Sequence, residues 1–234
     1  MSSRDEVLIT ATELARMLAA GEPVTLLDVR WQLAEPDGRA THEAGHLPGA
    51  VYVSLEDELS DHTVAGRGRH PLPSGARVQE AARRWGVREG VPVVVYDDWN
   101  RAGSARAWWV LRAAGVHDVR ILDGGLAAWT GPLEAGLVAP ERGDVTVLHD
   151  DLYAGAMPTL TADEAATLGG GCSMRVHPNG FGARSNPSTP LPAMYPARRT
   201  SRAPRCSTRT VRSLRTAHCE RPWARPQGPT AGRA

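Results

Sequence analysis

The sequence predicts an α/β fold in which helices flank a doubly wound parallel sheet. Short apolar runs recur between residues 7 and 122, and helical patterns separate them. The run Val91–Tyr96 holds three consecutive valines, which is typical of a strand buried on both faces of a parallel sheet. Strands that alternate with helices at this spacing indicate repeated βαβ units, so we expect one sheet with helices on both sides.

The elements follow in a regular order. We expect strands at 7–10, 24–29, 51–53, 91–96 and 119–122, and helices at 11–20, 76–85 and 103–114, with a short helix at 126–129. Gly21, Gly86 and Gly115 stand directly after the three longer helical patterns, where glycine commonly ends a helix. Residues 31–41 and 61–75 lack periodicity and are expected as loops.

Length and composition favour a soluble protein. The 234 residues suffice for one large domain or for two domains of roughly 110 residues each. No run of about 18 apolar residues is present, and the beginning of the chain lacks the basic-then-apolar pattern of a signal peptide. We therefore expect a cytoplasmic location and no membrane partner.

Charge divides the chain into two unlike parts. Residues 1–170 carry 15 arginines and 25 acidic residues, whereas residues 171–234 carry 12 arginines and a single acid, Glu220. The second part also holds half of the prolines and all three cysteines, Cys172, Cys206 and Cys219, at irregular spacing. This composition predicts a disordered Arg/Pro-rich segment with free thiols, and no disulfide set or metal site.

The loop Asp97–Ala102 is the place where this fold class positions its chemistry. It leads from the carboxyl end of a buried strand into a helix, so several backbone N–H groups and the helix dipole point into one concavity that suits an anion. A cysteine at the base of such a cradle would be a reactive thiolate. This sequence has Asp97 at that position.

Six motifs in order give the sequence a family resemblance. They are LLDVRW (26–31), GHLPGA (45–50), GRHPLP (68–73), VVVYDD (93–98), ARAWWVLR (105–112) and VRILDGGLAAW (119–129). Together they closely resemble the rhodanese family, and specifically the first half of the tandem-domain thiosulfate or 3-mercaptopyruvate sulfurtransferases. The resemblance covers about residues 6–170.

The resemblance implies two rhodanese domains and no cofactor. The second domain would carry a cysteine that takes sulfur from a small anionic donor, forms a persulfide and passes the sulfur to cyanide or a thiol. The first would be catalytically silent, with aspartate in the matching loop, as Asp97 is here. A carboxylate cannot accept and release sulfane sulfur, so we assign no catalytic residue to this domain.

We divide the chain accordingly. The rhodanese domain of the silent type is expected at 6–131, a Gly/Pro/acid-rich linker at 132–158 and the start of a second domain at 159–170, where TLTADEAATL is similar to ITATELARML of the first. Residues 171–234 contain no second LDxR, GHxPGA or cysteine loop. Cys206 and Cys219 follow no apolar strand pattern, so we expect neither to be a nucleophile.

A change of reading frame near Gly169–Cys172 explains this break. If the third base of each codon is read with the first two bases of the next, permitted codons for CSMRVHPNGFGARSNPSTPLPAMYPA can spell LDARASERFRGEVEPIDPAAGHVPGA. That string restores LDAR and GHVPGA in the expected order. The methionine codons allow no choice of base, and they still give residues that fit. A naturally divergent disordered tail is the alternative.

Several other polar residues are candidates for a site. Arg101 and Arg106 could line an anion pocket, although arginines on a helix are more commonly solvated or ion-paired. His46, with the acidic partner Asp37, could form the proton-handling pair that the resemblance implies beside an interdomain cleft; a purely structural His-Pro turn is the alternative. We expect Asp97 to cap loop N–H groups.

Two functional classes remain open beside a lost sulfurtransferase activity. A non-catalytic rhodanese module could bind an anion or a protein through the Asp97 loop. The arginine-rich tail could bind nucleic acid, but under the frame hypothesis its charge is an accident of codon usage, and we do not expect that function.

Overall fold

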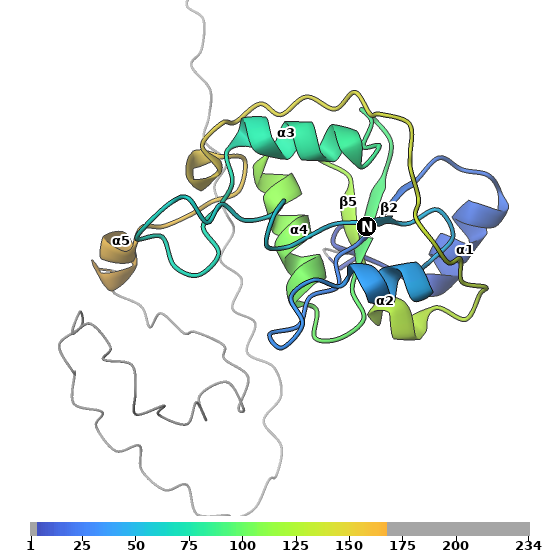
Figure 1. Ribbon diagram of the computed structural model, residues 1–234. Coiled ribbons are helices and arrows are strands. Elements are labelled where there is room, and N and C mark those ends of the chain that lie inside the picture. The colour runs from blue at the N-terminus through green and yellow to red at the C-terminus, as the bar shows by residue number, and fades with distance from the viewer. Residues whose placement is uncertain (1–3, 168–234) are drawn as a thin grey trace, which may run out of the picture. The chain divides into compact units, whose positions relative to one another are not determined.

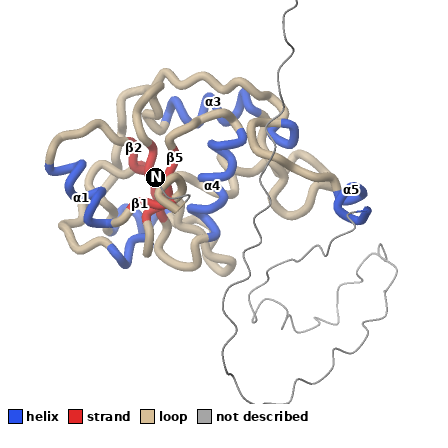
Figure 2. Tube along the Cα trace, turned by 180° about the vertical axis from the view of Figure 1, so that it is seen from behind, coloured by secondary structure: helices blue, strands red, loops and turns tan. Residues whose placement is uncertain are grey.

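The computed structural model describes residues 4–167, which fold as an α/β domain (Figures 1 and 2). The strands are β1 (Leu8–Ile9), β2 (Thr25–Asp28), β3 (Val51–Tyr52), β4 (Val93–Tyr96) and β5 (Val119–Leu122). The helices are α1 (Ala11–Ala19), α2 (Arg39–Ala44), α3 (Gly75–Arg84), α4 (Ala102–Ala113) and α5 (Ala162–Thr167), with 3-10 turns η1 (Gly125–Ala128) and η2 (Leu152–Ala154).

The five strands form one parallel sheet in the order β1-β5-β4-β2-β3. This confirms the predicted fold class. Strand β4 lies in the centre, where it pairs with β2 on one side and β5 on the other, and all four of its residues are buried. The continuous apolar run in the sequence is therefore explained by burial on both faces.

Alternate side chains of the sheet belong to two separate cores. Val93 and Val95 pack with α3 and α4 in one cluster, whereas Val94 and Tyr96 pack with Leu14 and Met17 of α1 in the other. This period of two is the geometry of a strand. Figure 1 shows α3 and α4 on one side of the sheet and α1 on the other, and Figure 2 shows the same arrangement from behind.

Most predicted elements are present with shifts of one or two residues at their ends. The exception is α2, which lies at 39–44, overlapping the end of the predicted loop at 31–41. Its six residues, RATHEA, are too few to show a helical period, and its N-cap, Gly38, makes no side-chain cap. Its His42 is fully buried, which indicates that packing against the rest of the domain holds the helix in place.

The segment expected as a linker, 132–158, lies along the domain. Glu134 and His46 form an isolated antiparallel bridge, and the N–H of Gly143 donates to the carbonyl of Arg83. Val145 and Leu152 are buried in the core of α3 and α4. This segment is thus part of the packed unit. No helix among residues 4–167 is long and apolar enough to span a membrane.

After this segment the chain enters α5, which begins with a capping box. The Thr161 hydroxyl accepts from the N–H of Glu164, whose carboxylate accepts from the N–H of Thr161. The rest of the expected second-domain start, the proposed frame change and the tail with its cysteines lie outside the described residues.

Candidate functional site

The loop between β4 and α4 is held tightly against its neighbours. Arg101, the residue before α4, has a left-handed backbone with φ 71°. At Gly103 a β-carbon would lie 1.9 Å from the carbonyl oxygen of Val29, so only glycine allows α4 to begin this close to the end of β2. The amide of Leu126 donates to the Asp97 carbonyl at 2.9 Å, which ties the loop to η1.

The Asp97 side chain fills the concavity of this loop with its own carboxylate. It is 3% exposed. One oxygen accepts from the N–H groups of Trp99 and Arg101, both at 3.3 Å, and the other accepts from the N–H and hydroxyl of Ser104 at 3.1 and 2.7 Å. The amides that would hold an external anion are therefore bound to an internal one.

The two candidate arginines have different positions. The Arg101 guanidinium folds back over the loop, 3.5 Å from Asp97 and 3.0 Å from the carbonyl of Trp99. Arg106 lies on the next turn of α4 and donates to the carbonyls of Leu59, His70 and Pro71 at 2.8 to 3.2 Å.

The Arg106 guanidinium thus donates to backbone carbonyls and forms no ion pair within residues 4–167, and its place in an anion pocket stays a prediction. The loop 59–71 returns over α4, and its carbonyls occupy the guanidinium. Burial lowers the pKa of Arg106. The hydrogen bonds of its Nε and Nη2 atoms hold that loop on the helix.

His46 and Asp37 do not form a pair. His46 is fully buried, with Nδ1 2.9 Å from the carbonyl of Leu47 and Nε2 3.2 Å from that of Gly136. Asp37 is exposed, and its carboxylate accepts from the Tyr52 hydroxyl at 3.1 Å and from the N–H of Arg39 at 3.0 Å. In this domain both ring nitrogens of His46 face backbone carbonyls, which corresponds to the structural alternative.

A buried polar network stands at the end of β2. The Asp28 carboxylate is completely buried and forms an internal ion pair with the Arg30 guanidinium at 2.9 Å. The same carboxylate also accepts from His42 at 3.0 Å and from the Tyr96 hydroxyl at 2.8 Å. Burial, followed by the charge of Asp28, raises the pKa of Tyr96, so this hydroxyl stays protonated and acts as a donor.

Sequence reasoning did not find His42 or Asp98. His42 stacks on His46 with 4.1 Å between ring centroids, a contact that only the fold of α2 creates. One carboxylate oxygen of Asp98 is buried without a hydrogen-bond partner in the structure. Burial raises the pKa of Asp98, and the nearby Arg30 opposes that rise. Within residues 4–167 no group of three or more His, Cys, Asp or Glu side chains could hold a metal ion.

Comparison with known proteins matches the chain to one domain family and to named sulfurtransferases. Residues 10–132 match the model of the rhodanese-like domain. The chain is 69% identical over 172 residues to the putative thiosulfate sulfurtransferase SseB of Mycobacterium tuberculosis, covering 72% of this chain and 61% of that protein. It is 40% identical over 164 residues to the probable 3-mercaptopyruvate sulfurtransferase of Pseudomonas aeruginosa, covering 69% and 56%. The chain thus spans about six-tenths of the length of these curated relatives.

A solved structure agrees with this match. The crystal structure of SseA from Escherichia coli, described as a 3-mercaptopyruvate sulfotransferase with a rhodanese fold, superimposes with a TM-score of 0.53 at 33% identity. The match covers 62% of this chain and 56% of that one. The ordered motifs, the parallel sheet and the matched domain model together show that the chain belongs to the rhodanese family.

Proposed function

We propose that this chain is the first half of a sulfurtransferase of the thiosulfate or 3-mercaptopyruvate class and that its rhodanese domain does not itself transfer sulfur. The names of the relatives support the class. The loop of the domain supports the second part, because Asp97 stands where a sulfur-carrying cysteine would have to stand.

Sulfur transfer needs a thiolate at the base of the loop. The thiolate attacks the outer sulfur of a donor such as thiosulfate, the S–S bond breaks, sulfite leaves with the electron pair, and a persulfide forms. Cyanide then takes the outer sulfur as thiocyanate and regenerates the thiolate. The Asp97 oxygens offer no sulfur nucleophile, so neither step can begin here.

The single observation that carries this proposal is the saturation of the loop by Asp97. Two backbone N–H groups of the loop and the N–H and hydroxyl of Ser104 all donate to its carboxylate. A small anionic donor entering the loop would meet a fixed negative charge and donors that are already used. The domain thus lacks both the nucleophile and the anion site.

We further propose that the reading frame changes near Gly169–Cys172, so that a second rhodanese domain with a cysteine loop is encoded but not translated in this chain. The recovered LDAR and GHVPGA motifs support this. Sequencing the gene across the codons for Leu168–Met174 tests it directly: an unbroken second frame carrying a cysteine loop is expected, and stop codons in that frame would refute it.

The activity is tested by sulfur transfer from thiosulfate to cyanide. The purified 234-residue chain is expected to give no thiocyanate above the buffer rate, and a variant with Cys172, Cys206 and Cys219 changed to serine should behave identically. The frame-restored protein is the matched positive control and should turn over. Robust turnover by the 234-residue chain that disappears in the serine variant would overturn the proposal.

A second candidate function is protein binding by the same loop. Trp99 supports it, because this large apolar side chain is 54% exposed at the end of the loop. The anion-binding version has less support, since the loop amides are occupied. Binding of a partner that is lost in Trp99→Ala and kept in Arg101→Gln would favour this function over a silent half-enzyme.

A further inference from the structure

Residues 135–142 form a strap between two anchor points on the domain. The first anchor is Glu134, which forms the isolated bridge with His46, and the second is Gly143, whose N–H donates to α3. Between these anchors, Gly136 alone makes a backbone–backbone hydrogen bond within the described part of the chain. The position of the strap therefore depends on how Gly136 is held.

The other polar contacts of the strap lie at the surface. Glu141 pairs with Arg88 and Arg142 pairs with Glu80, both at 2.6 Å, and all four side chains are at least 46% exposed. Such pairs contribute little to stability. Gly136 has a φ of 97°, and no atom lies within 4 Å of the place that a β-carbon would take. The strap thus has room to move once Gly136 is released.

The carbonyl of Gly136 meets a fully buried histidine. Nε2 of His46 lies 3.2 Å from this carbonyl oxygen, and Nδ1 lies 2.9 Å from the carbonyl oxygen of Leu47. A neutral imidazole has one N–H and one lone pair, whereas an imidazolium donates from both nitrogens. Both hydrogen bonds can therefore form only when His46 is protonated. In the neutral ring a lone pair would face a carbonyl oxygen, and one acceptor would lose its partner.

The titratable and charged groups around His46 contact its ring or its nearest neighbours. They are His42 of α2, which stacks on the ring, Asp28 at the end of β2 with its partner Arg30, Tyr96 of β4, and Glu134 of the first anchor. The two carboxylates outnumber the one guanidinium. The Tyr96 hydroxyl is uncharged, because burial raises its pKa. This net negative charge favours an imidazolium, whereas burial opposes it.

We propose that His46 is a proton-dependent latch that holds the strap. The imidazolium donates to Leu47 and Gly136 together and keeps the strap closed. When the proton is lost, Nδ1 keeps the shorter hydrogen bond, to Leu47, and Gly136 is released. The strap opens as the pH rises through the range in which histidine ordinarily titrates, around pH 6.5. No residue of the Asp97 loop takes part, so the latch is independent of the function proposed above.

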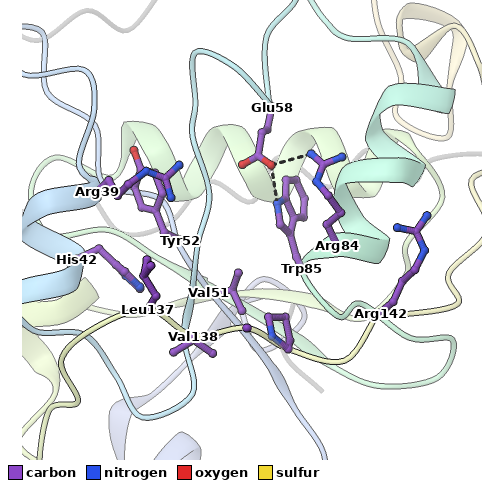
Figure 3. A pocket seen from close by; sticks show the side chains of 12 residues that line it. Arg39, His42, Val51, Tyr52, Glu58, Arg84, Trp85, Leu137, Val138 and Arg142 are labelled. Carbon is purple, nitrogen blue, oxygen red and sulfur yellow. Dashed lines mark hydrogen bonds and ion pairs between the residues drawn. The ribbon is translucent and has the colours of Figure 1, made fainter.

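Opening of the strap changes a cavity of about 450 Å³ beside the edge strand β3 (Figure 3). Leu137, Val138 and Pro140 of the strap line this cavity, together with Tyr52 of β3 and Trp85 at the end of α3. Because the strap supplies part of the wall, its release widens the cavity. The proton on His46 thereby controls access to the space between β3 and the strap.

The test is nuclear magnetic resonance of the isotope-labelled full chain at about pH 5.5 and about pH 7.5, on either side of the range in which histidine titrates. The ring nitrogen shifts of His46 should show two protonated nitrogens at the lower pH and a protonated Nδ1 alone at the higher. Hydrogen exchange of the Gly136 amide, which donates to the carbonyl of Glu43, reports on the strap. Its protection factor, corrected for the intrinsic effect of pH on exchange, should fall about tenfold, as expected for the loss of one charge-assisted hydrogen bond.

Matched controls separate the latch from a general effect of pH. Gly143 fastens the other end of the strap to the carbonyl of Arg83, and its protection should stay the same. His46→Gln keeps a side-chain donor but cannot titrate, so it should abolish the pH dependence at Gly136. His117→Gln, at an exposed histidine after α4, should retain it.

Circular dichroism checks that each variant folds, and the measurements on the unaltered chain need no variant. Three results would each overturn the proposal: an unchanged protonation state of His46 between the two pH values, an equal pH dependence at Gly136 and Gly143, or a pH dependence at Gly136 that persists in His46→Gln.

Discussion

Two buried carboxylates at the same end of the sheet are held in opposite ways. Asp28 ends β2, and Asp97 follows β4 directly, next to Tyr96, whose register partner on β2 is Asp28. The partners of Asp28 are the side chains of Arg30, His42 and Tyr96, up to 68 residues away in sequence. The partners of the Asp97 carboxylate all lie within seven residues and are mostly backbone amides of the loop and of the first turn of α4.

This difference in partners indicates which part of the fold each carboxylate stabilises. The contacts of Asp28 exist only after β2, α2 and β4 have come together, so they stabilise the domain as a whole. Those of Asp97 need only the loop and the first turn of α4, so they stabilise one local conformation. A loop held by local contacts can change its base residue at modest cost, because the sheet does not depend on those contacts.

The largest effect is expected at Asp28. Asp28→Ala leaves the Arg30 guanidinium, which is 5% exposed, without its carboxylate. An unpaired buried charge costs about 3–5 kcal/mol of unfolding free energy. Urea unfolding followed by circular dichroism measures the loss. Glu141→Gln is the control, because it breaks the exposed pair with Arg88 and should cost under about 1 kcal/mol. Equal losses in the two variants would remove the distinction between the sites.

A smaller and more specific effect is expected at Asp97. Asp97→Ala removes the acceptor from the loop amides and should cost about 2 kcal/mol, as for a lost helix cap with a buried hydroxyl partner. It also vacates the anion site. Sulfate at millimolar concentration should therefore raise the melting temperature of Asp97→Ala more than that of the unaltered chain. Asp28→Asn, which keeps the loop filled, is the control. An equal sulfate effect in all three would show that the loop is no anion cradle.

The local contacts were largely predictable from the sequence. Three valines and a tyrosine before Asp97 predict the buried strand, and the position of Asp97 before a helix predicts a capping carboxylate. The parallel sheet and the position of the Asp97 loop at the carboxyl end of a strand follow from the βαβ alternation, whereas the strand order was not predicted. These features depend on neighbouring residues, so a pattern in the chain suffices to show them.

The features that the sequence did not show depend on chain segments that meet only in the fold. Nothing near Arg106 indicates that residues 59–71 return to present three carbonyls to it. Asp37 and His46 are nine positions apart, but the Tyr52 hydroxyl takes the first and the segment at Gly136 covers the second. His42 became a partner of Asp28 through a six-residue helix that is too short to leave a periodic signal.

Arg106 and Arg101, at the N-terminal end of α4, repeat the contrast between distant and local contacts. Arg106→Met removes the donor from the carbonyls of the 59–71 loop and should lower the unfolding free energy by about 1–2 kcal/mol, because buried carbonyls lose their partner. Arg101→Gln removes a half-exposed ion pair and should cost less than about 0.5 kcal/mol. Hydrogen exchange should also show faster exchange in the 59–71 loop for Arg106→Met alone. Comparable destabilisation by both would contradict the assignment of Arg106 to that loop.

The smallest effect is expected at Glu56, a partly exposed carboxylate that accepts from His62, His70 and Trp31. Burial alone would raise its pKa, but the hydrogen bonds from His70 and Trp31 outweigh burial and lower it below 4.5. A carboxylate with a lowered pKa stabilises the fold above its unfolded-state pKa, and this contribution disappears as the pH falls through the lowered value. Between pH 6 and pH 3.5 the unaltered chain should therefore lose more stability than Glu56→Gln, by less than about 1 kcal/mol. The partners of Glu56 are side chains, like those of Asp28, but they lie nearer the solvent. If urea unfolding shows that the unaltered chain and Glu56→Gln lose the same unfolding free energy between pH 6 and pH 3.5, these partners contribute nothing to stability.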